Sequence, residues 1–254
     1  MLNKIKNSTY ILFMLCLLAF KTDNTSWKTC TISEIDGEIK KMEAFYKSNT
    51  SYSVLITHSS FIGHNAITPF EKSEGFLIKH GTNLHSMILG IETIQNDKWK
   101  VVIDSSSNTI AVSDIEKEIQ NQALPLNALL AKKNITVCKK ADLQGSDKLF
   151  HIEFSAPVKL LAEEMKIGAD YRLKELTMLY REKYNVDPEN ANSPKEQPKV
   201  TIVLKDYKLN PKIDIKKEFN TNTYFVVDKA GNFVLTPVFK QYEILDLRIS
   251  KNIK

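Results

Sequence analysis

Apolar and polar residues alternate over short segments along most of the chain, and this period of two constrains the fold more than any other feature. Val54 and Ile56 fall on one side of such a segment, whereas Leu55 falls on the other, as in a β-strand. Later segments follow as hairpins, for example residues 99–103 and 110–112 around a polar turn. Short turns of this kind join antiparallel strands. The pattern therefore predicts an antiparallel sheet, which the final segments continue: residues 200–204, 224–227, 233–235 and 245–249.

Two segments depart from the alternation and predict helices. The first is capped by Thr31 or Ser33, with an acid three residues on as a capping box requires, and its apolar stripe consists of Ile35, Ile39, Met42 and Phe45. The second runs from Leu124 to Lys132, where Pro125 suits the first turn and one side carries Leu126, Leu129 and Leu130.

Two further stretches are less regular. Residues 165–184 fit either a helix or long strands, and residues 185–199 contain three prolines among polar residues, which predicts a loop. Strands throughout with two helices predict an α+β fold that is mostly one strongly bent antiparallel sheet.

The N-terminal segment, residues 1–22, indicates export from the cytoplasm. Lys4 and Lys6 precede an uninterrupted apolar run over residues 10–20. This run is short for a membrane-spanning helix, which needs roughly 20 apolar residues, but it has the length of the apolar core of a signal peptide. Small residues for cleavage are scarce, so the segment is expected to be either a signal peptide or an uncleaved anchor. Neither Cys16 nor Cys30 follows the small residue that a lipid-modified cysteine requires.

Charge and cysteines narrow the class of protein further. The formal net charge is +5; three of these positive charges and no negative one belong to the first 21 residues, so +2 remains for the rest. Lysines interleave with acids rather than gathering on one face, which argues against nucleic-acid binding. Cys30 and Cys138 can pair in an oxidising compartment, but two buried free thiols fit the sequence as well.

The sequence carries no recognisable catalytic motif. It lacks a Gly-x-Ser-x-Gly elbow, a glycine-rich phosphate loop and a Cys-x-x-Cys pair. A metal site would need scattered histidines to meet, above all His80 and His85 around one predicted turn. We therefore expect no enzyme, cofactor or metal; an exported hydrolase or metalloenzyme would instead need these groups clustered in one pocket.

Alternating apolar residues on neighbouring strands leave one apolar face. If the sheet curls without closing, that face becomes a trough, which suits an acyl chain because each buried methylene contributes roughly 0.8 kcal/mol. Tight packing of the helices into a dry core needs the same pattern, so both interpretations remain open. The residues expected to contact a ligand in the cavity belong to the early strands: Tyr52, Val54, Ile56, Phe76, Ile78, Leu84, Val101 and Ile103. The second helix is expected to form the lid through Leu126, Leu129 and Leu130.

Several stretches resemble the outer-membrane lipoprotein carriers of the LolA/LolB type. They are the glycine-led segment 74–78, the pair 100–104 and 109–112, and the ending formed by residues 224–227 and 242–248. The resemblance implies one domain over residues 30–254, and the chain departs from the carriers by a longer insertion around residues 160–199. It also implies an open half-barrel in which two or more helices cover the concave face and lipid or lipoprotein acyl chains enter the apolar interior.

The leading hypothesis is therefore an exported, non-enzymatic protein of the periplasm or cell envelope that binds lipid or lipoprotein acyl chains. It either carries them across the periplasm or stays tethered to the membrane through residues 10–20. The alternative is an envelope scaffold of the same fold with a dry core and a protein partner instead of a lipid.

Overall fold

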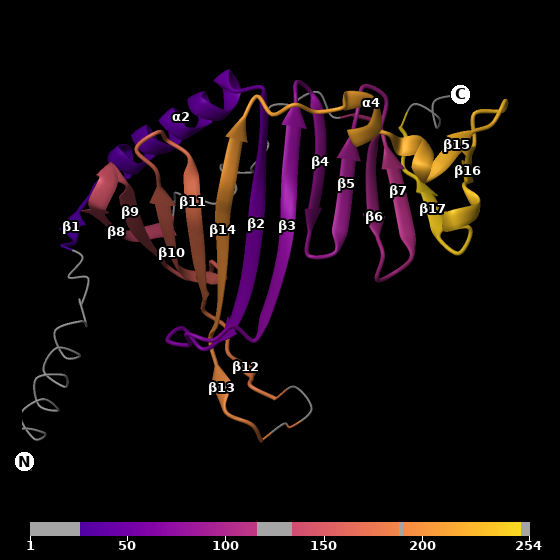
Figure 1. Cartoon of the computed structure of the whole chain (residues 1–254). Coiled ribbons are helices and arrows are strands. Elements are labelled where there is room, and N and C mark those ends of the chain that lie inside the picture. The colour runs from indigo at the N-terminus through magenta and orange to yellow at the C-terminus, as the bar shows by residue number, and fades with distance from the viewer. Residues whose placement is uncertain (1–25, 116–133, 188–189, 191, 250–254) are drawn as a thin grey trace, which may run out of the picture.

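Thirteen strands of the described residues form one large sheet, in the order β1-β8-β9-β10-β11-β14-β2-β3-β4-β5-β6-β7-β17 (Figure 1). The structure is a computed structural model that describes residues 26–115, 134–187, 190 and 192–249. The strands of this sheet are β1 (Lys28–Thr29), β2 (Ser51–Ile62), β3 (Glu71–His80), β4 (Asn83–Ile88), β5 (Ile91–Gln95), β6 (Lys100–Asp104), β7 (Thr109–Ser113), β8 (Ile135–Asp142), β9 (Lys148–Phe154), β10 (Leu160–Ile167), β11 (Leu173–Tyr180), β14 (Pro198–Leu209) and β17 (Glu243–Asp246).

Smaller elements complete the described chain. Two hairpins, β12 (Tyr184–Asn185) with β13 (Lys195–Glu196) and β15 (Phe225–Val227) with β16 (Phe233–Leu235), form two-stranded sheets of their own. The helices are α2 (Ile32–Ser48), the short α4 (Ile215–Glu218) and single 3₁₀ turns at Gln144–Ser146, Thr221–Thr223 and Pro237–Phe239. None of the helices in the described ranges is long and apolar enough to span a membrane.

The prediction of a mostly antiparallel sheet is confirmed. Consecutive strands from β2 to β7 pair antiparallel, and so do β8 to β11, most of them through short turns. Only β17 among the described strands pairs parallel, with Ile244 beside Ile110 on β7. The ambiguous residues 165–184 contain the end of β10, all of β11 and the start of β12 rather than a helix, and β10 and β11 pair along most of their length. Part of the predicted loop 185–199 forms the β12–β13 hairpin.

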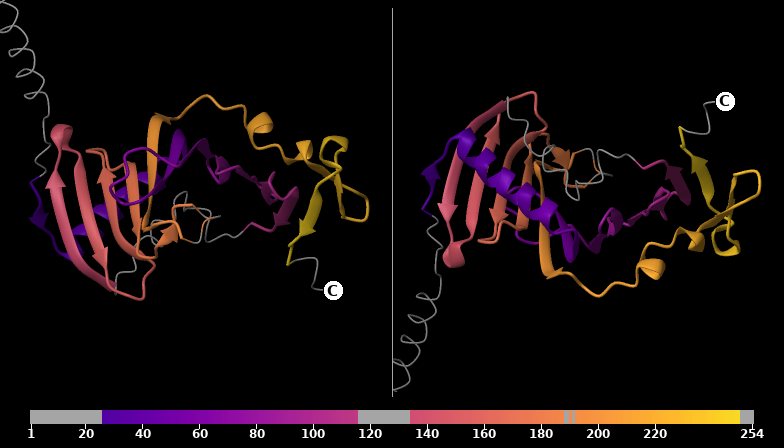
Figure 2. Two further views of the ribbon diagram at one scale, coloured as in Figure 1. Left: turned by 90° about the horizontal axis from the view of Figure 1, so that it is seen from below. Right: turned by 90° about the horizontal axis from the view of Figure 1, so that it is seen from above.

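One long strand joins the two halves of the sheet. β14 lies between β11 and β2, and its pairing with β2 runs from Pro198 opposite Ile62 to Leu209 opposite Tyr52. The sheet does not close on itself: its edge strands β1 and β17 lie at opposite ends of the molecule, and the strands from β8 to β2 curve around one end (Figure 2).

Gly75 allows β3 and β4 to approach closely. A Cβ atom at this position would lie 2.0 Å from the backbone oxygen of Met87, on the next strand. The ladder between these strands begins next to this point, where Phe76 is paired with Met87. Only a residue without a side chain fits there.

The two faces of the sheet carry two separate hydrophobic cores. We call the face that α2 covers the inner face; it carries Val54 on β2, Phe150 on β9 and Met165 on β10, which pack with the helix. The opposite, outer face carries the second core on β5 to β7, where Val101 and Ile110 pack against Phe225 from the C-terminal segment. The register explains this division, because Val54 is paired with Leu77 whereas Ile78, Ile94 and Val101 share the other face.

The first predicted helix is confirmed, with one correction in its stripe. Thr31 and Glu34 form the capping box, but the fourth buried position is Tyr46 rather than Phe45, which is only partly buried. Spacings of four, three and four residues keep the stripe on one face of the helix. The second predicted helix, with Leu126, Leu129 and Leu130, lies outside the described residues.

Candidate functional site on the inner face

The inner face is an apolar surface beneath and beside α2. Ile35 and Met42 of the helix are fully buried, and they join a cluster with aliphatic and aromatic side chains from five strands. Strand alternation places these side chains on the same face. The sheet contributes Tyr52, Val54 and Ile56 from β2, Leu77 from β3, Phe150, Ile152 and Phe154 from β9, Met165 and Ile167 from β10, and Leu173 and Leu176 from β11.

The N-terminal end of α2 is fastened to the sheet by a covalent bond. Cys30 and Cys138 form a disulfide with their Cα atoms 5.3 Å apart, which settles the alternative that the sequence left open. The bond connects positions separated by 108 residues along the chain. Closing a loop of that length stabilises a fold by about 4–5 kcal/mol in the chain-entropy view.

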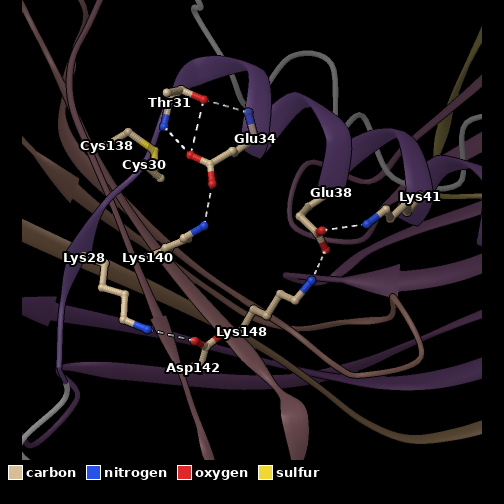
Figure 3. A network of polar contacts seen from close by, with 10 residues as sticks. All are labelled: Lys28, Cys30, Thr31, Glu34, Glu38, Lys41, Cys138, Lys140, Asp142 and Lys148. Carbon is tan, nitrogen blue, oxygen red and sulfur yellow. Dashed lines mark hydrogen bonds and ion pairs between the residues drawn. A yellow bond between two sulfur atoms is a disulfide. The ribbon is translucent and has the colours of Figure 1, made fainter.

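Ion pairs reinforce this attachment (Figure 3). Lys140 binds Glu34, and Lys148 lies 2.8 Å from Glu38, which also accepts a hydrogen bond from Lys41 at 2.9 Å. The hydrogen bond from Lys140 is the main cause that lowers the pKa of Glu34 to about 2. These residues line a pocket of about 300 Å³ between α2, β8 and β9, whose charges are therefore already paired.

Three tyrosines cluster at the other end of α2. The rings of Tyr52 and Tyr207 stack with centroids 5.2 Å apart, and Tyr46 packs against both. The Tyr46 hydroxyl accepts a hydrogen bond of 3.4 Å from the backbone N–H of Leu173. The Arg172 guanidinium lies over the Tyr207 ring at 5.0 Å. Burial raises the pKa of Tyr46 to about 12, and it raises the pKa values of Tyr52 and Tyr207 as well, so all three hydroxyls are neutral.

Two ionisable side chains are buried on the same face. Glu163 has no exposed surface, and neither of its carboxyl oxygens has a hydrogen-bond partner among the described residues. Burial raises its pKa to about 8, so that it carries a proton at neutral pH. Lys79 is 6% exposed, paired across the strands with Tyr52 and Leu84, and burial lowers its pKa. Both groups are shifted toward their uncharged forms.

The eight residues expected to contact a ligand do not share one face. Four lie on the inner face, because Tyr52, Val54 and Ile56 alternate on β2 and Leu84 is in the row of Tyr52. The other four lie on the outer face, where they contribute to the second core or border it: Phe76, Ile78, Val101 and Ile103. The inner face is thus built largely from later strands that these candidates do not include.

The outer face holds a histidine bridge rather than a cluster suited to a metal. The two ring nitrogens of His85 lie 2.7 Å from Glu218 on α4 and 2.8 Å from Glu92 on β5. Burial acts to lower the pKa of His85, but the hydrogen bonds to these carboxylates outweigh it and raise the pKa. His80 is engaged elsewhere, with Ser51 at 3.2 Å. In the described ranges no group of three histidines, cysteines or acids is placed to hold a metal ion.

Sequence reasoning missed Glu163 and Tyr207, whose ring stacks on that of the predicted candidate Tyr52. Two adjacent acids, Glu163 and Glu164, indicate a solvated charged stretch. This holds for Glu164, which faces outward and lies 3.0 Å from His151. One signal was available: in a strand, alternation puts Glu163 on the side of Met165 and Ile167. Tyr207 lies within a register shift of β14, between Lys205 and Lys208, and such an irregularity cannot be read from the pattern of residues.

The comparisons with known proteins concern the fold alone. The sequence matches no protein-family model, and no curated protein is significantly similar to it. Similar solved structures include a LolA superfamily protein from Nitrosomonas europaea, with 10% identity, a TM-score of 0.31 and coverage of 74% of this chain and 97% of that chain. The lipoprotein LppX from Mycobacterium tuberculosis has 11% identity, a TM-score of 0.36 and coverage of 72% and 99%, respectively.

A DUF1329 family protein from Desulfovibrio piger is similar as well, with 7% identity, a TM-score of 0.32 and coverage of 74% of this chain and 98% of that chain. The three solved structures are thus a LolA superfamily protein, the lipoprotein LppX and a DUF1329 family protein, with TM-scores between 0.31 and 0.36.

Proposed function

We propose that this protein binds acyl chains of lipids or lipoproteins on the inner face, without catalysing a reaction. In this proposal the curved part of the sheet acts as an open half-barrel, and α2 covers part of its concave side. The ligand contacts are Tyr52, Val54, Ile56 and Leu84 among the sequence candidates, together with the aliphatic and aromatic residues of β9 to β11.

One observation supports ligand binding over a dry core. Four polar groups on the inner face have buried atoms without a hydrogen-bond partner in the described structure: the hydroxyls of Tyr52 and Tyr207, His58 Nδ1 and the carboxyl of Glu163. Each such group costs about 1–3 kcal/mol when it is left unsatisfied. A ligand that is mostly apolar but carries a few polar atoms can remove this cost if it displaces the side chains that cover these atoms, whereas aliphatic packing cannot.

The disulfide supports a location outside the cytoplasm. Disulfides form and persist in oxidising compartments, and the bond between Cys30 and Cys138 agrees with export directed by the N-terminal residues. We propose the periplasm or the cell envelope, where the protein either diffuses as a carrier or stays attached through residues 10–20.

Lipid binding can be tested by native mass spectrometry of the exported protein. The protein is expressed as the full chain and purified gently, so that bound lipid is retained. We expect added mass that solvent extraction releases as lipid. Ile202 on β14 faces inward, opposite Leu176 and His58, whereas its neighbour Val203 faces outward. Ile202→Phe is expected to reduce lipid occupancy several-fold, and the matched control Val203→Phe to leave it unchanged. A ligand-free mass for the folded wild type, or equal losses in both variants, would contradict the proposal.

A second function has support from the surface of the C-terminal segment. Six aliphatic side chains on or beside β15, β16 and β17 are between 37% and 73% exposed: Val226, Val234, Val238, Leu245, Leu247 and Ile249. Exposed apolar groups of this kind mark protein–protein contacts. The second candidate function is therefore that of an envelope scaffold, which binds a protein partner through this surface. Co-purification of one stoichiometric protein partner, without lipid, would favour it.

A further inference from the structure

Glu163 lies on the inner face, along β10 and away from the end of this strand to which α2 is attached. The helix is held near one end of β10, because its Glu38 binds Lys148, which is paired with Ile167. Figure 1 shows α2 running across one end of β8 to β11. Glu163 lies four residues back along β10 from Ile167, which is about 13 Å along a strand. Its neighbours across the sheet are Ile152 on β9 and Met178 on β11.

The carboxyl group has an unused capacity for hydrogen bonding. It is fully buried, both of its oxygens lack a partner among the described residues, and its neighbours in register are apolar. A neutral carboxyl group offers one O–H donor and one carbonyl acceptor. An aliphatic side chain at this position would avoid the cost of leaving these atoms unsatisfied.

The neutral carboxyl group of Glu163 favours some classes of ligand over others. A cationic ligand would create an ion pair in an apolar site, where removing two charges from water costs several kcal/mol for each ion. An alkane or ether tail would leave the O–H without a strong acceptor. An ester or amide carbonyl, in contrast, places an acceptor directly next to an acyl chain, and it needs no charge.

On the basis of the acyl-chain binding proposed above, we propose that Glu163 donates its O–H to the carbonyl oxygen of the ester or amide that links the bound acyl chain. The ligands are therefore O-acylated or N-acylated molecules, and Glu163 distinguishes them from lipids whose chains are attached through ether bonds. The hydrogen bond changes no covalent bond in the ligand.

A pair of lipids tests this assignment: dioleoyl phosphatidylglycerol and its di-O-oleyl ether analogue, which lacks the carbonyl oxygens. The delipidated full chain is offered vesicles of both, and the bound ratio is read by native mass spectrometry. We expect the wild type to prefer the ester lipid about tenfold, which corresponds to one net hydrogen bond. Glu163→Gln keeps an N–H donor and should keep the preference. Glu163→Leu, which fills the space without a donor, should bind both lipids equally.

The outcomes separate this inference from the proposed function. If the wild type binds both lipids equally, or if Glu163→Leu keeps the preference, acyl-chain binding stands and the role of Glu163 is wrong. If the wild type binds neither lipid, the proposed function fails and the inference fails with it. Circular dichroism of each variant, with Glu163→Met as a second apolar replacement, shows whether a change in binding reflects lost folding.

Discussion

At the scale of single residues, the inner face is marked by buried polar groups whose pKa values are shifted toward the neutral form. Burial shifts the pKa of Glu163 upward and that of Lys79 downward, each toward its neutral form. Tyr52 and Tyr207 retain their protons for the same reason. Burying a further unpaired charge on such a surface is costly, whereas hydrogen bonds with a mostly apolar ligand are possible.

The burial of Glu163 predicts a specific dependence of stability on pH. Its pKa in the folded state, about 8, lies above the ordinary value of 4.5 for an exposed glutamate. The folded state therefore binds the proton more tightly, and stability falls as the pH rises from 4.5 toward 8. The penalty reaches about 3 kcal/mol at pH 7, from about 1.4 kcal/mol for each pH unit.

Urea unfolding of the wild type and of Glu163→Gln between pH 4.5 and pH 8 measures this effect. The variant cannot ionise at this position, so its unfolding free energy should exceed that of the wild type by a margin that grows with pH. Parallel curves for the two proteins would show that Glu163 is solvated in the folded state.

At the scale of elements, local patterns account for most of what forms. The capping box begins α2 at the expected residue, and the alternating segments form the expected strands. The attachment of one element to another depends instead on contacts between residues that are distant in sequence. α2 is held by the disulfide to β8 and by ion pairs to β8 and β9, which are more than 100 residues away in sequence.

The approach of β3 to β4 at Gly75 gives a prediction at this scale. Gly75→Ala places a methyl group against the backbone oxygen of Met87, and the strands must shift. We expect a loss of about 2–3 kcal/mol in unfolding free energy. The control is Gly37→Ala in α2, where a Cβ would meet no atom within 4 Å. That substitution should stabilise the protein by up to about 1 kcal/mol, because alanine favours the helix. Equal effects of the two substitutions in urea unfolding would contradict this explanation.

At the scale of the whole molecule, one continuous sheet supports two cores on opposite faces. The helix covers one face at the β8–β2 end, and the C-terminal segment with Phe219, Tyr224 and Phe225 covers the other face at the β4–β7 end. Figure 2 shows the C-terminal segment and α2 over different parts of the sheet. Because neither core shares its buried side chains with the other, we expect them to respond separately to substitution.

Hydrogen exchange can test this independence. Ile110 and Ile152 are both fully buried, one in each core. Each change to alanine should cost about 2–5 kcal/mol locally. Ile110→Ala is expected to speed amide exchange in β5 to β7 and β15, while β9 and β10 remain protected. Ile152→Ala should do the reverse. Uniform acceleration across the sheet in either variant would show that the two cores unfold together.

The sequence by itself determined the elements: the capped helix, the strands and their hairpins follow from local spacing, turn residues and capping, which act over a few positions. Only the tertiary structure decided the faces. Four of the eight candidate residues lie on the outer face because the register of β3 with β2 and β4 places Phe76 and Ile78 there. The insertion of β14 between β11 and β2 likewise brings Glu163 and Tyr52 onto one surface. Such pairings depend on contacts between distant segments, and the same alternating pattern is compatible with either face being covered.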